Sequence, residues 1–280
     1  MRIKGFIRTF FFSLKGLKCI LKSLWFGRRS SPQNRNDRNA LIMGNGPSLK
    51  SVDVVNLSKN ADVICVNYYA VNNKDFFIIR PEYYCFLDPV FFNSNPDKKT
   101  ADLIKTLESV DWNLKIITVQ GNKLPIENKN IEYEYISIAD IYGNYSKKFL
   151  NYLHKKNLAN CGLQNVLAGA IYYCILNRYH KVLVCGFDMS EFQAYSVNKD
   201  NHILVKYSHF YGDEYIDATE SGRIKLGDFY FWINCYAKMF EQFHYLSEFA
   251  IEQGVDVINL TTESFVDSFK KDYWKNYLNT

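Results

Sequence analysis

The sequence predicts an α/β fold in which helices cover both faces of a mostly parallel sheet. Two observations lead to this class. Short apolar runs alternate along the chain with longer helical patterns, and several runs are apolar at every position, as in strands buried on both faces. The 280 residues, 48% of them hydrophobic, are enough for one large core. We therefore expect a Rossmann-like domain.

The expected elements follow in order along the chain. Apolar runs bounded by turn signals predict strands at residues 40–43, 61–70, 83–92, 114–120, 181–189 and 255–261. Helical spacing predicts helices at 101–110, 146–157, within the apolar stretch 157–179, and at 229–253. Residues 189–222 have weak periodicity and many polar side chains, so we expect a long loop with a little helix that covers a site as a lid.

The first strand runs directly into the sequence GNGPSL at residues 44–49. Gly44 and Gly46 permit positive φ and close backbone approach. Asn45 supplies an amide that both donates and accepts, and Ser48 is a favourable helix N-cap. A strand, a tight turn and a helix start of this kind direct backbone N–H groups toward a phosphate. The same residues also suit a turn without a ligand, because the full GxGxxG spacing and the Walker lysine are missing.

Polar residues follow most of the predicted strands. Ligands of wound parallel sheets bind beyond the carboxyl ends of the strands, where the strand order reverses. The positions in question are Asn45, Asn67, Asp88, Asp188 and Thr261. Asp188 is expected either to orient a ribose hydroxyl or to cap the lid, and Asp88, which precedes a proline, also fits a simple Asx turn.

The N-terminal segment, residues 1–38, is strongly basic. It holds ten of the 34 Lys and Arg but one of the 29 Asp and Glu, which leaves 24 basic and 28 acidic side chains in the domain 39–280. In residues 1–29, apolar side chains recur every three or four positions with lysines between them, as in an amphipathic helix. The lysines leave no apolar stretch of about 20 residues for spanning a bilayer, and no cleavage site of a signal peptide follows.

We expect this helix, which the polar linker 30–39 joins to the domain, to lie on the surface of an anionic membrane. A helix packed on the domain or on a second subunit is the first alternative. Nucleic-acid binding is a weaker one, because a thick apolar stripe separates the basic residues and the rest of the chain is acidic.

The seven cysteines are odd in number, lie mostly within apolar runs and form no CxxC pair. They predict reduced, buried thiols, a cytosolic location and no zinc site. Cys161 has no neighbours in the sequence that would lower its pKa, so we do not expect it to act as a nucleophile.

Seven motifs within residues 40–265 point to a family. They are, in chain order, GNGPSL, VNYYAV, FLDPVFF, NCG, CGFDM, SHFYG and NLTTES. This series resembles the bacterial sialyltransferases of glycosyltransferase family forty-two. GNGPSL also occurs in a wider Rossmann-like group that includes archaeal pterin pyrophosphokinases and flagellin glycosyltransferases, whereas SHFYG favours the sialyltransferases. The resemblance implies a GT-A-like variant of the fold and a CMP-sugar as donor.

The resemblance also implies roles for single residues in binding the donor. Asn45 and Gly46 match positions that lie against CMP, and Asn67 matches one that bonds the phosphate or the sugar. The turn 160–162 matches the one that binds the carboxylate of the sugar, with a cysteine where the family has a serine. Asp88 stands where the family usually has asparagine. The predicted donor-binding residues are thus Asn45, Gly46, Asn67, Asp88, Asn160, Cys161, Gly162 and, from its place after a strand, Asp188.

Two residues match catalytic positions of the family. His209 matches the base, and Tyr195 matches one of two lid tyrosines that contact the leaving phosphate. The second of these positions holds a serine, and a leucine replaces the family's arginine before the sugar-binding turn. Arg80, Lys155 and Lys156 are further candidates for contacts to phosphate or acceptor.

The chemistry of transfer from a CMP-activated sugar acid agrees with these residues. The leaving phosphate is already stabilised, so no metal is required, and no DxD-type pair follows a strand. A histidine with a pKa near neutrality can take the acceptor proton, while tyrosine hydroxyls and backbone N–H groups stabilise the phosphate. We prefer His209, which aromatic residues flank, over His202 in an exposed turn; His154, among lysines, is expected on a solvated face.

We therefore expect an inverting glycosyltransferase that moves sialic acid, or a related nonulosonic acid, from a CMP-sugar to a galactose-type hydroxyl of a bacterial surface glycan such as lipooligosaccharide. Its expected place is the bacterial cytoplasm, on the inner face of the cytoplasmic membrane, where lipid-linked acceptors are found. The family implies homo-oligomers. A CMP-Kdo or other CMP-sugar transferase, a pterin pyrophosphokinase relative and a non-catalytic nucleotide-binding scaffold are the alternatives.

Overall fold

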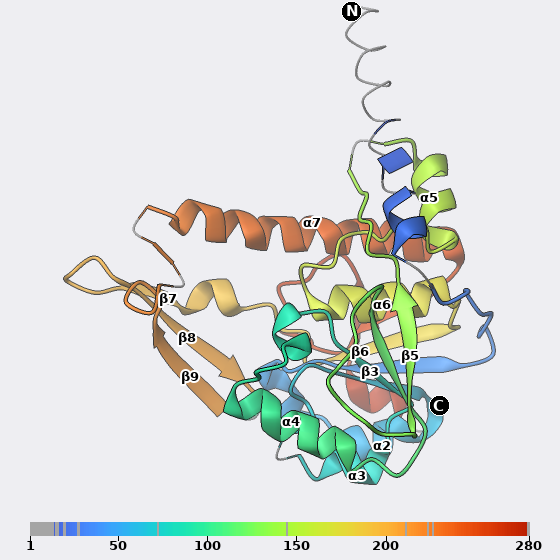
Figure 1. Cartoon of the computed structure of the whole chain (residues 1–280), viewed down its shortest axis with the longest axis horizontal. Helices are drawn as coiled ribbons and strands as arrows, with labels where there is room; N and C mark the ends of the chain where they lie inside the picture. Colours follow the sequence, from blue (N-terminus) through green and yellow to red (C-terminus); the bar gives the residue numbers. More distant parts are fainter. Residues whose placement is uncertain are drawn as a thin grey trace, which may run out of the picture.

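An eight-stranded parallel sheet forms the centre of the molecule (Figure 1). The computed structural model describes residues 14, 17–18, 21–26, 29–71, 73–143, 145–210, 212–222, 224–225 and 227–278. In spatial order the strands are β11 (Lys270–Lys271), β10 (Asp256–Asn259), β6 (Lys181–Cys185), β1 (Asn39–Met43), β2 (Asp62–Val66), β3 (Tyr83–Cys85), β4 (Leu114–Val119) and β5 (Ile131–Ile136). All neighbouring pairs are parallel, which confirms the predicted α/β class.

The strand order reverses next to β1. The chain adds β2 to β5 on one side of β1 and then returns to place β6 on its other side, where Ile42 lies opposite Val184. The loops after β1 and β6 therefore leave the sheet in neighbouring positions at its carboxyl edge. This edge is where parallel wound sheets bind ligands.

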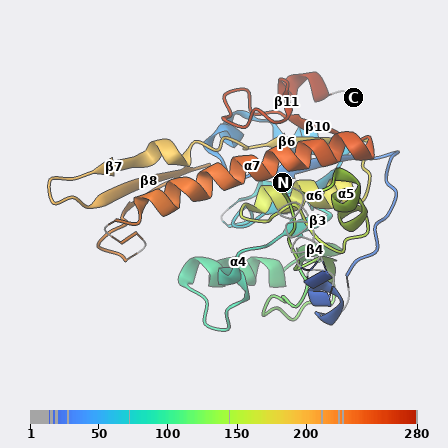
Figure 2. The ribbon, with the colours of Figure 1, turned by 90° about the horizontal axis from the view of Figure 1, so that it is seen from above.

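Helices cover both faces of the sheet (Figures 1 and 2). One face carries α2 (Val54–Leu57), α3 (Asp75–Ile79) and α4 (Lys98–Glu108), and the other carries α6 (Val166–Leu176) and α7 (Phe229–Gln253), with α5 (Lys147–Lys155) beside them. Short 3-10 helices occupy Pro47–Ser51, Ser58–Asn60, Pro89–Phe92, Glu191–Ala194 and Trp274–Tyr277. Side chains alternate along a strand, so β1 contributes to a core on each face of the sheet. Leu41 and Met43 pack into the core on the side of α2, α3 and α4, and Ala40 and Ile42 pack into the core on the side of α6 and α7.

Residues 189–222 differ from the expected loop. They contain a three-stranded antiparallel sheet of β7 (Tyr195–Val197), β8 (Ile203–His209) and β9 (Gly212–Asp217), which projects from the body beside the N-terminal half of α7 (Figures 1 and 2). Its own small cluster contains Ile203, Val205, Ala218 and Ile224. Only one face of these strands is buried, so their sequence carries a weak hydrophobic signal, and the expectation of a loop was wrong for that reason.

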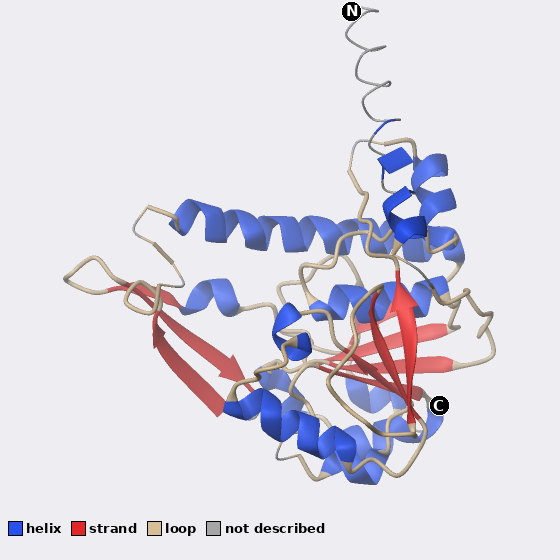
Figure 3. Cartoon of the chain, viewed as in Figure 1, coloured by secondary structure: helices blue, strands red, loops and turns tan. Residues whose placement is uncertain are grey.

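Other elements also depart from the expected ones. Strand β5 was not predicted, because only its last residue is fully buried and charged residues interrupt it. The strand expected in 83–92, which the sequence predicts to stop at Asp88 and Pro89, ends earlier, at Cys85, and Pro89 begins a 3-10 helix. The long helix 229–253 and the other predicted helices lie within a few residues of where they were expected. Figure 3, in the view of Figure 1, shows the helices in blue.

The polar segment before β1 is packed against the sheet. Arg35 donates to the Asp62 carboxylate at 3.1 Å and to the Tyr179 hydroxyl at 3.0 Å, and the Ser30 amide donates to the carbonyl of Tyr135 at 3.1 Å. The segment predicted as a linker is thus held on the domain by side-chain and backbone bonds. Of the amphipathic helix expected before it, residues 1–13, 15–16, 19–20 and 27–28 lie outside the described residues. None of the helices in the described part of the chain combines the length and apolar content needed to cross a membrane.

Candidate active site

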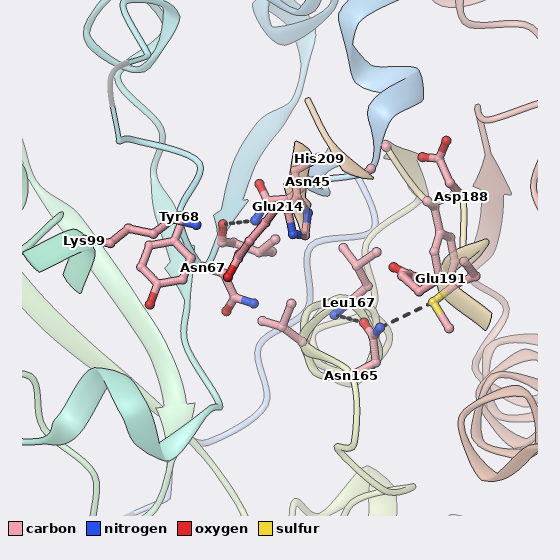
Figure 4. A pocket seen from close by; sticks show the side chains of 16 residues that line it. Asn45, Asn67, Tyr68, Lys99, Asn165, Leu167, Asp188, Glu191, His209 and Glu214 are labelled. Carbon is pink, nitrogen blue, oxygen red and sulfur yellow. Dashed lines mark hydrogen bonds between the residues drawn. The ribbon is translucent and has the colours of Figure 1, made fainter. Parts of the chain in front are cut away.

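A cavity of about 330 Å³ lies at the carboxyl ends of β1, β2 and β6, where the strand order reverses (Figure 4). It is lined by the loops after these strands, the first turn of α6, the start of α4 and the end of the β8–β9 hairpin. The lining residues are Asn45, Gly46, Val66, Asn67, Tyr68, Lys99, Asn165, Val166, Leu167, Gly186, Phe187, Asp188, Met189, Glu191, His209 and Glu214. The structure thus brings together five of the predicted site residues: Asn45, Gly46, Asn67, Asp188 and His209.

Glycines allow the loops after β1 and β6 to pack backbone against backbone. The Gly44 amide donates to the carbonyl of Cys185 at 2.8 Å, and the Gly46 amide donates to that of Gly186 at 3.1 Å. A Cβ on Gly44 would lie 2.4 Å from the Gly186 carbonyl oxygen, and one on Gly46 would lie 1.9 Å from Oδ2 of Asp188. Any side chain at these two positions would therefore push the two loops apart.

Ser48 binds Asp188 and is not the helix cap that the sequence predicted. Its amide and its hydroxyl donate to the two carboxylate oxygens of Asp188 at 3.1 and 2.7 Å, and its hydroxyl lies 3.3 Å from that of Thr261. The turn after β1 leads into the 3-10 helix Pro47–Ser51, in which Gly46 holds the N-cap position and Ser48 is an internal residue. Burial raises the pKa of Asp188.

Helix α6, which follows the turn 160–162, brings an N-terminus to the cavity. Asn165 caps it by accepting from the amide of Leu167 at 2.8 Å, and its own amide group donates to the sulfur of Met189 at 3.4 Å. Asn165, Val166 and Leu167 all line the cavity. The positive end of an 11-residue helix therefore points into the site, which favours an anionic ligand group there.

Three buried oxygen atoms of the cavity lining have no hydrogen-bond partner in the described part of the protein: Oδ1 of Asn45, Oδ1 of Asn67 and Oε2 of Glu191. The Asn45 amide is held in place because its Nδ2 donates to the carbonyl of Val66 at 3.2 Å. Asn67 has a left-handed backbone with φ of 47°. Leaving a buried acceptor unpaired costs about 1–3 kcal/mol, so these atoms suit a ligand that donates N–H or O–H groups.

His209 ends β8 and lies in the cavity beside Asn45 (Figure 4). The hairpin is tied to the first loop because the amide of Phe210 donates to the Asn45 carbonyl at 3.1 Å. Burial, and secondly the charge of Lys99, lower the pKa of His209, while Glu214 acts in the opposite direction. A lowered pKa leaves the imidazole neutral near pH 7, which is the form that a general base requires.

His202, the other candidate base, lies outside the cavity lining. Its Nδ1 is 2.9 Å from a carboxylate oxygen of Asp217 on the paired strand. This hydrogen bond raises the pKa of His202. The imidazole of His202 is thus hydrogen-bonded within the β8–β9 hairpin.

Tyr195 does not line the cavity. Its hydroxyl is 3.1 Å from that of Tyr236 on α7, and its ring packs edge-on against Phe229 with a centroid distance of 5.4 Å. These contacts hold β7 against the N-terminal half of α7.

The turn 160–162 also lies outside the cavity lining, behind the start of α6. Asn160 donates to the carbonyl of Ser137 at 2.8 Å and accepts from the amide of Gly162 at 2.7 Å. Gly162 has φ of +97°, and a Cβ there would lie 2.4 Å from the amide nitrogen of Gln242. Burial raises the pKa of the Cys161 thiol, which therefore stays protonated. All six described cysteines are free thiols.

Asp88 forms the Asx turn that its sequence allows. Its carboxylate accepts from the amide of Val90 at 3.0 Å and caps the 3-10 helix Pro89–Phe92. It is not part of the cavity lining.

His154 is buried, and the expectation of a solvated face was wrong. It is 3% exposed, its Nε2 lies 2.8 Å from the carbonyl oxygen of Ile141, and its Nδ1 lies 3.3 Å from the sulfur of Cys161. The lysines beside it lie on other faces of α5, because side chains next to each other in a helix point in different directions. Burial lowers the pKa of His154 to about 4.

Sequence reasoning missed five polar or charged lining residues: Tyr68, Lys99, Asn165, Glu191 and Glu214. Asn165 carried a usable signal, since an asparagine directly before an apolar helix is a typical N-cap. The others come from elements far apart in the chain, and only the fold shows that they meet. In the described residues no group of three or more His, Cys, Asp and Glu side chains is arranged to hold a metal ion.

No family model and no curated protein matches this sequence. Three solved structures, all of one sialyltransferase, are similar in backbone. CST-II in complex with a trisaccharide acceptor and CMP is 14% identical, with 84% of this chain and 85% of that chain covered and a TM-score of 0.44. A tyrosine-to-phenylalanine variant in complex with CMP is 14% identical with the same coverage and a TM-score of 0.42. A phenylalanine-to-tyrosine variant, described as an alpha-2,3/8-sialyltransferase, is 15% identical over 84% and 86% of the chains, with a TM-score of 0.43.

Proposed function

We propose that this protein is an inverting glycosyltransferase that transfers sialic acid, or a related nonulosonic acid, from a CMP-sugar to a galactose-type hydroxyl of a bacterial surface glycan. One observation carries the proposal. A histidine with a lowered pKa, His209, stands beside the unpaired amide oxygens of Asn45 and Asn67 in a cavity at the reversal of strand order. The motifs GNGPSL and SHFYG, which supply Asn45 and His209, support the same reading from the sequence.

The donor would lie across the loops after β1 and β6. The backbone N–H groups at the start of α6 suit its phosphate, because the N-terminus of a helix presents a positive dipole end. Asp188 is a partly buried acceptor beside Gly46 and suits a ribose hydroxyl. Asn45 and Asn67 would accept from hydroxyl or amide groups of the donor.

His209 would take the proton of the acceptor hydroxyl as that oxygen attacks the anomeric carbon. The bond to the CMP phosphate breaks on the opposite side, so the configuration inverts. Because CMP is a good leaving group, its departure needs hydrogen-bond donors and no metal ion. Tyr195 would reach the leaving phosphate only after the three-stranded sheet β7–β8–β9 moves toward the cavity. Asp88 and the turn 160–162 would act by supporting the loops around the donor.

We also propose that residues 1–38 hold the enzyme on the inner face of the bacterial cytoplasmic membrane, where lipid-linked acceptors are available. Of the described residues there, Leu21, Leu24 and Trp25 are exposed, and Trp25 is 87% exposed. Ser23, among the same described residues, is buried and accepts a hydrogen bond from Ser137 at 3.0 Å. An apolar face turned to solvent beside exposed lysines fits an anionic bilayer.

The first experiment measures CMP release from CMP-sialic acid in EDTA, with and without lactose. The His209→Ala variant should lose about 10²- to 10⁴-fold in rate, the usual contribution of a general base, while His202→Ala should retain the wild-type rate. A large loss in His202→Ala instead would make that residue the base. Turnover only with CMP-Kdo would change the donor, whereas a requirement for ATP and magnesium would favour the pyrophosphokinase alternative.

A further inference from the structure

The charges around the cavity are unevenly distributed. Asp188 and Glu191 lie toward one end of it, Lys99 lies with Tyr68 toward the other, and Glu214 lies between them (Figure 4). Of the described residues that line the cavity, Lys99 is the one with a lysine or arginine side chain. A negatively charged ligand group is therefore favoured at the Lys99 end and disfavoured at the other.

Lys99 has a defined position. It is the second residue of α4, whose N-cap Asp97 accepts from the amide of Thr100 at 2.8 Å. Its ammonium nitrogen lies 4.4 Å from the centre of the Tyr68 ring, and the Tyr68 hydroxyl is 2.9 Å from that of Thr100. The stem is half-buried and the charged end is held over an aromatic ring, so less side-chain entropy remains to be lost on binding.

Lys99 is also close enough to His209 to act on it electrostatically. Burial and then the Lys99 charge favour the neutral imidazole, while Glu214 and Asp213 on β9 and a hydrogen bond to the Asn45 backbone favour the charged form. An anion bound by Lys99 would lie beside the group that we propose as the base.

We propose that Lys99 binds the carboxylate of a sugar acid next to His209, an inference that rests on the proposed function. An ammonium and a carboxylate form a charge-assisted hydrogen bond, and such a bond in a partly dehydrated cavity discriminates strongly against a neutral sugar. The carboxylate has two possible sources. It belongs either to the sugar of the CMP-sugar donor or to an acidic sugar at the end of the acceptor glycan.

The test compares Lys99→Gln with the matched variant Lys98→Gln. Lys98 is the preceding residue on α4, is exposed and does not line the cavity. Calorimetry measures binding of CMP, of CMP carrying a non-transferable 3-fluoro sialic acid, of lactose and of sialyllactose. Loss of one charged hydrogen bond should weaken binding about 10- to 100-fold.

The two sources give different results. If the donor supplies the carboxylate, Lys99→Gln weakens the fluoro donor but not CMP. If the acceptor supplies it, the variant loses the preference for sialyllactose over lactose. Lys98→Gln should match the wild type, and Lys99→Arg should retain part of the affinity. If Lys99→Gln binds all four compounds as the wild type does, the role of Lys99 is overturned.

A kinetic readout separates this role from a structural one. Lys99→Gln removes a positive charge beside His209, so the acidic limb of the profile of kcat/KM against pH should move to higher pH. The proposal is contradicted if Lys99→Gln leaves both this acidic limb and the binding affinities unchanged. If the wild-type protein binds no CMP and releases none from any CMP-sugar, the proposed function fails, and the lactose and sialyllactose pair still decides whether Lys99 selects a carboxylate.

Discussion

At the scale of single residues, the cavity combines two tightly packed loops with buried oxygen atoms that have no hydrogen-bond donor in the described part of the protein. Gly44 and Gly46 let two loops touch through their backbones, which fixes Asn45 at the point where they meet. The amide oxygens of Asn45 and Asn67 are buried without a donor. Such atoms raise the free energy of the empty protein and lower it again when a ligand supplies the donor, so they are a physical indication of a binding site.

Glu214 provides a residue-scale prediction. Its negative charge favours the protonated form of His209, in opposition to burial and Lys99. Glu214→Gln should therefore lower the pKa of His209 and move the acidic limb of the kcat/KM profile to lower pH, the direction opposite to that of Lys99→Gln. Rate measurements between pH 4.5 and 8 would show this, with Asp228→Asn, at the N-terminus of α7, as a control that leaves the limb in place. If Glu214→Gln and Lys99→Gln shift the acidic limb in the same direction, the two side chains do not act on His209 with opposite charges, and the prediction is wrong.

At the scale of elements, helix α5 is held by a buried histidine. Nε2 of His154 donates to the carbonyl of Ile141, and Nδ1 of the neutral ring accepts from the Cys161 thiol. The ring also packs edge-on against Phe249 of α7. This residue links α5, the turn before α6, and α7. The cluster therefore supports the start of α6 from behind the cavity.

The buried His154 makes stability depend on pH. Its pKa is about 4 in the folded protein and about 6.5 when unfolded, so the unfolded chain binds more protons between these values. The contribution of His154 is fully present above pH 6.5 and is lost as the pH falls toward 4, by about 3 kcal/mol.

Urea unfolding at several pH values checks this prediction. His154→Gln should reduce the loss of stability between pH 6.5 and 4, whereas His180→Gln, at an exposed position, should leave it unchanged. An equally steep loss in His154→Gln would show that other groups cause it.

At the scale of the whole molecule, the described residues 21–26 and 29–38 are bonded to the domain. Ser23 bonds with Ser137, and Arg35 with Asp62, so the exposed side chains of residues 21–26 keep a fixed direction relative to the sheet. A membrane bound by these side chains would set the orientation of the cavity with respect to the lipid surface.

Vesicle binding tests the membrane contact. Replacing Leu21, Leu24 and Trp25 by serine should lower the partition coefficient onto vesicles with phosphatidylglycerol by at least about tenfold, because each buried apolar side chain contributes about 1.5–3 kcal/mol. Ile251→Ser serves as a control, since Ile251 is an equally apolar residue, 76% exposed, on α7. Wild-type binding that is absent, or that survives the triple replacement, would rule out this surface as the membrane contact.

The sequence by itself determined the class of the fold and the order of most elements. The central strands β1, β2 and β6 are apolar at nearly every position because both their faces are buried, and helix α7 has an unbroken pattern that ends at Gly254. Local signals of this kind survive in any tertiary context. Asn45, Asn67 and Asp188 were predictable as well, because each directly follows a buried strand at the carboxyl edge of the sheet, where ligands of such sheets bind.

Only the tertiary structure decided which residues meet. The hairpin β8–β9 and the strand β5 each bury little apolar surface, so their sequences carry a weak periodic signal. Lys99, Glu191 and Glu214 come from three separate elements, and nothing in the sequence near them indicates a shared cavity. Asn160, Cys161 and Gly162 lie behind α6 for the same reason: packing around the helix start determines where a turn lies, and this packing involves Ser137 and Gln242 from distant parts of the chain.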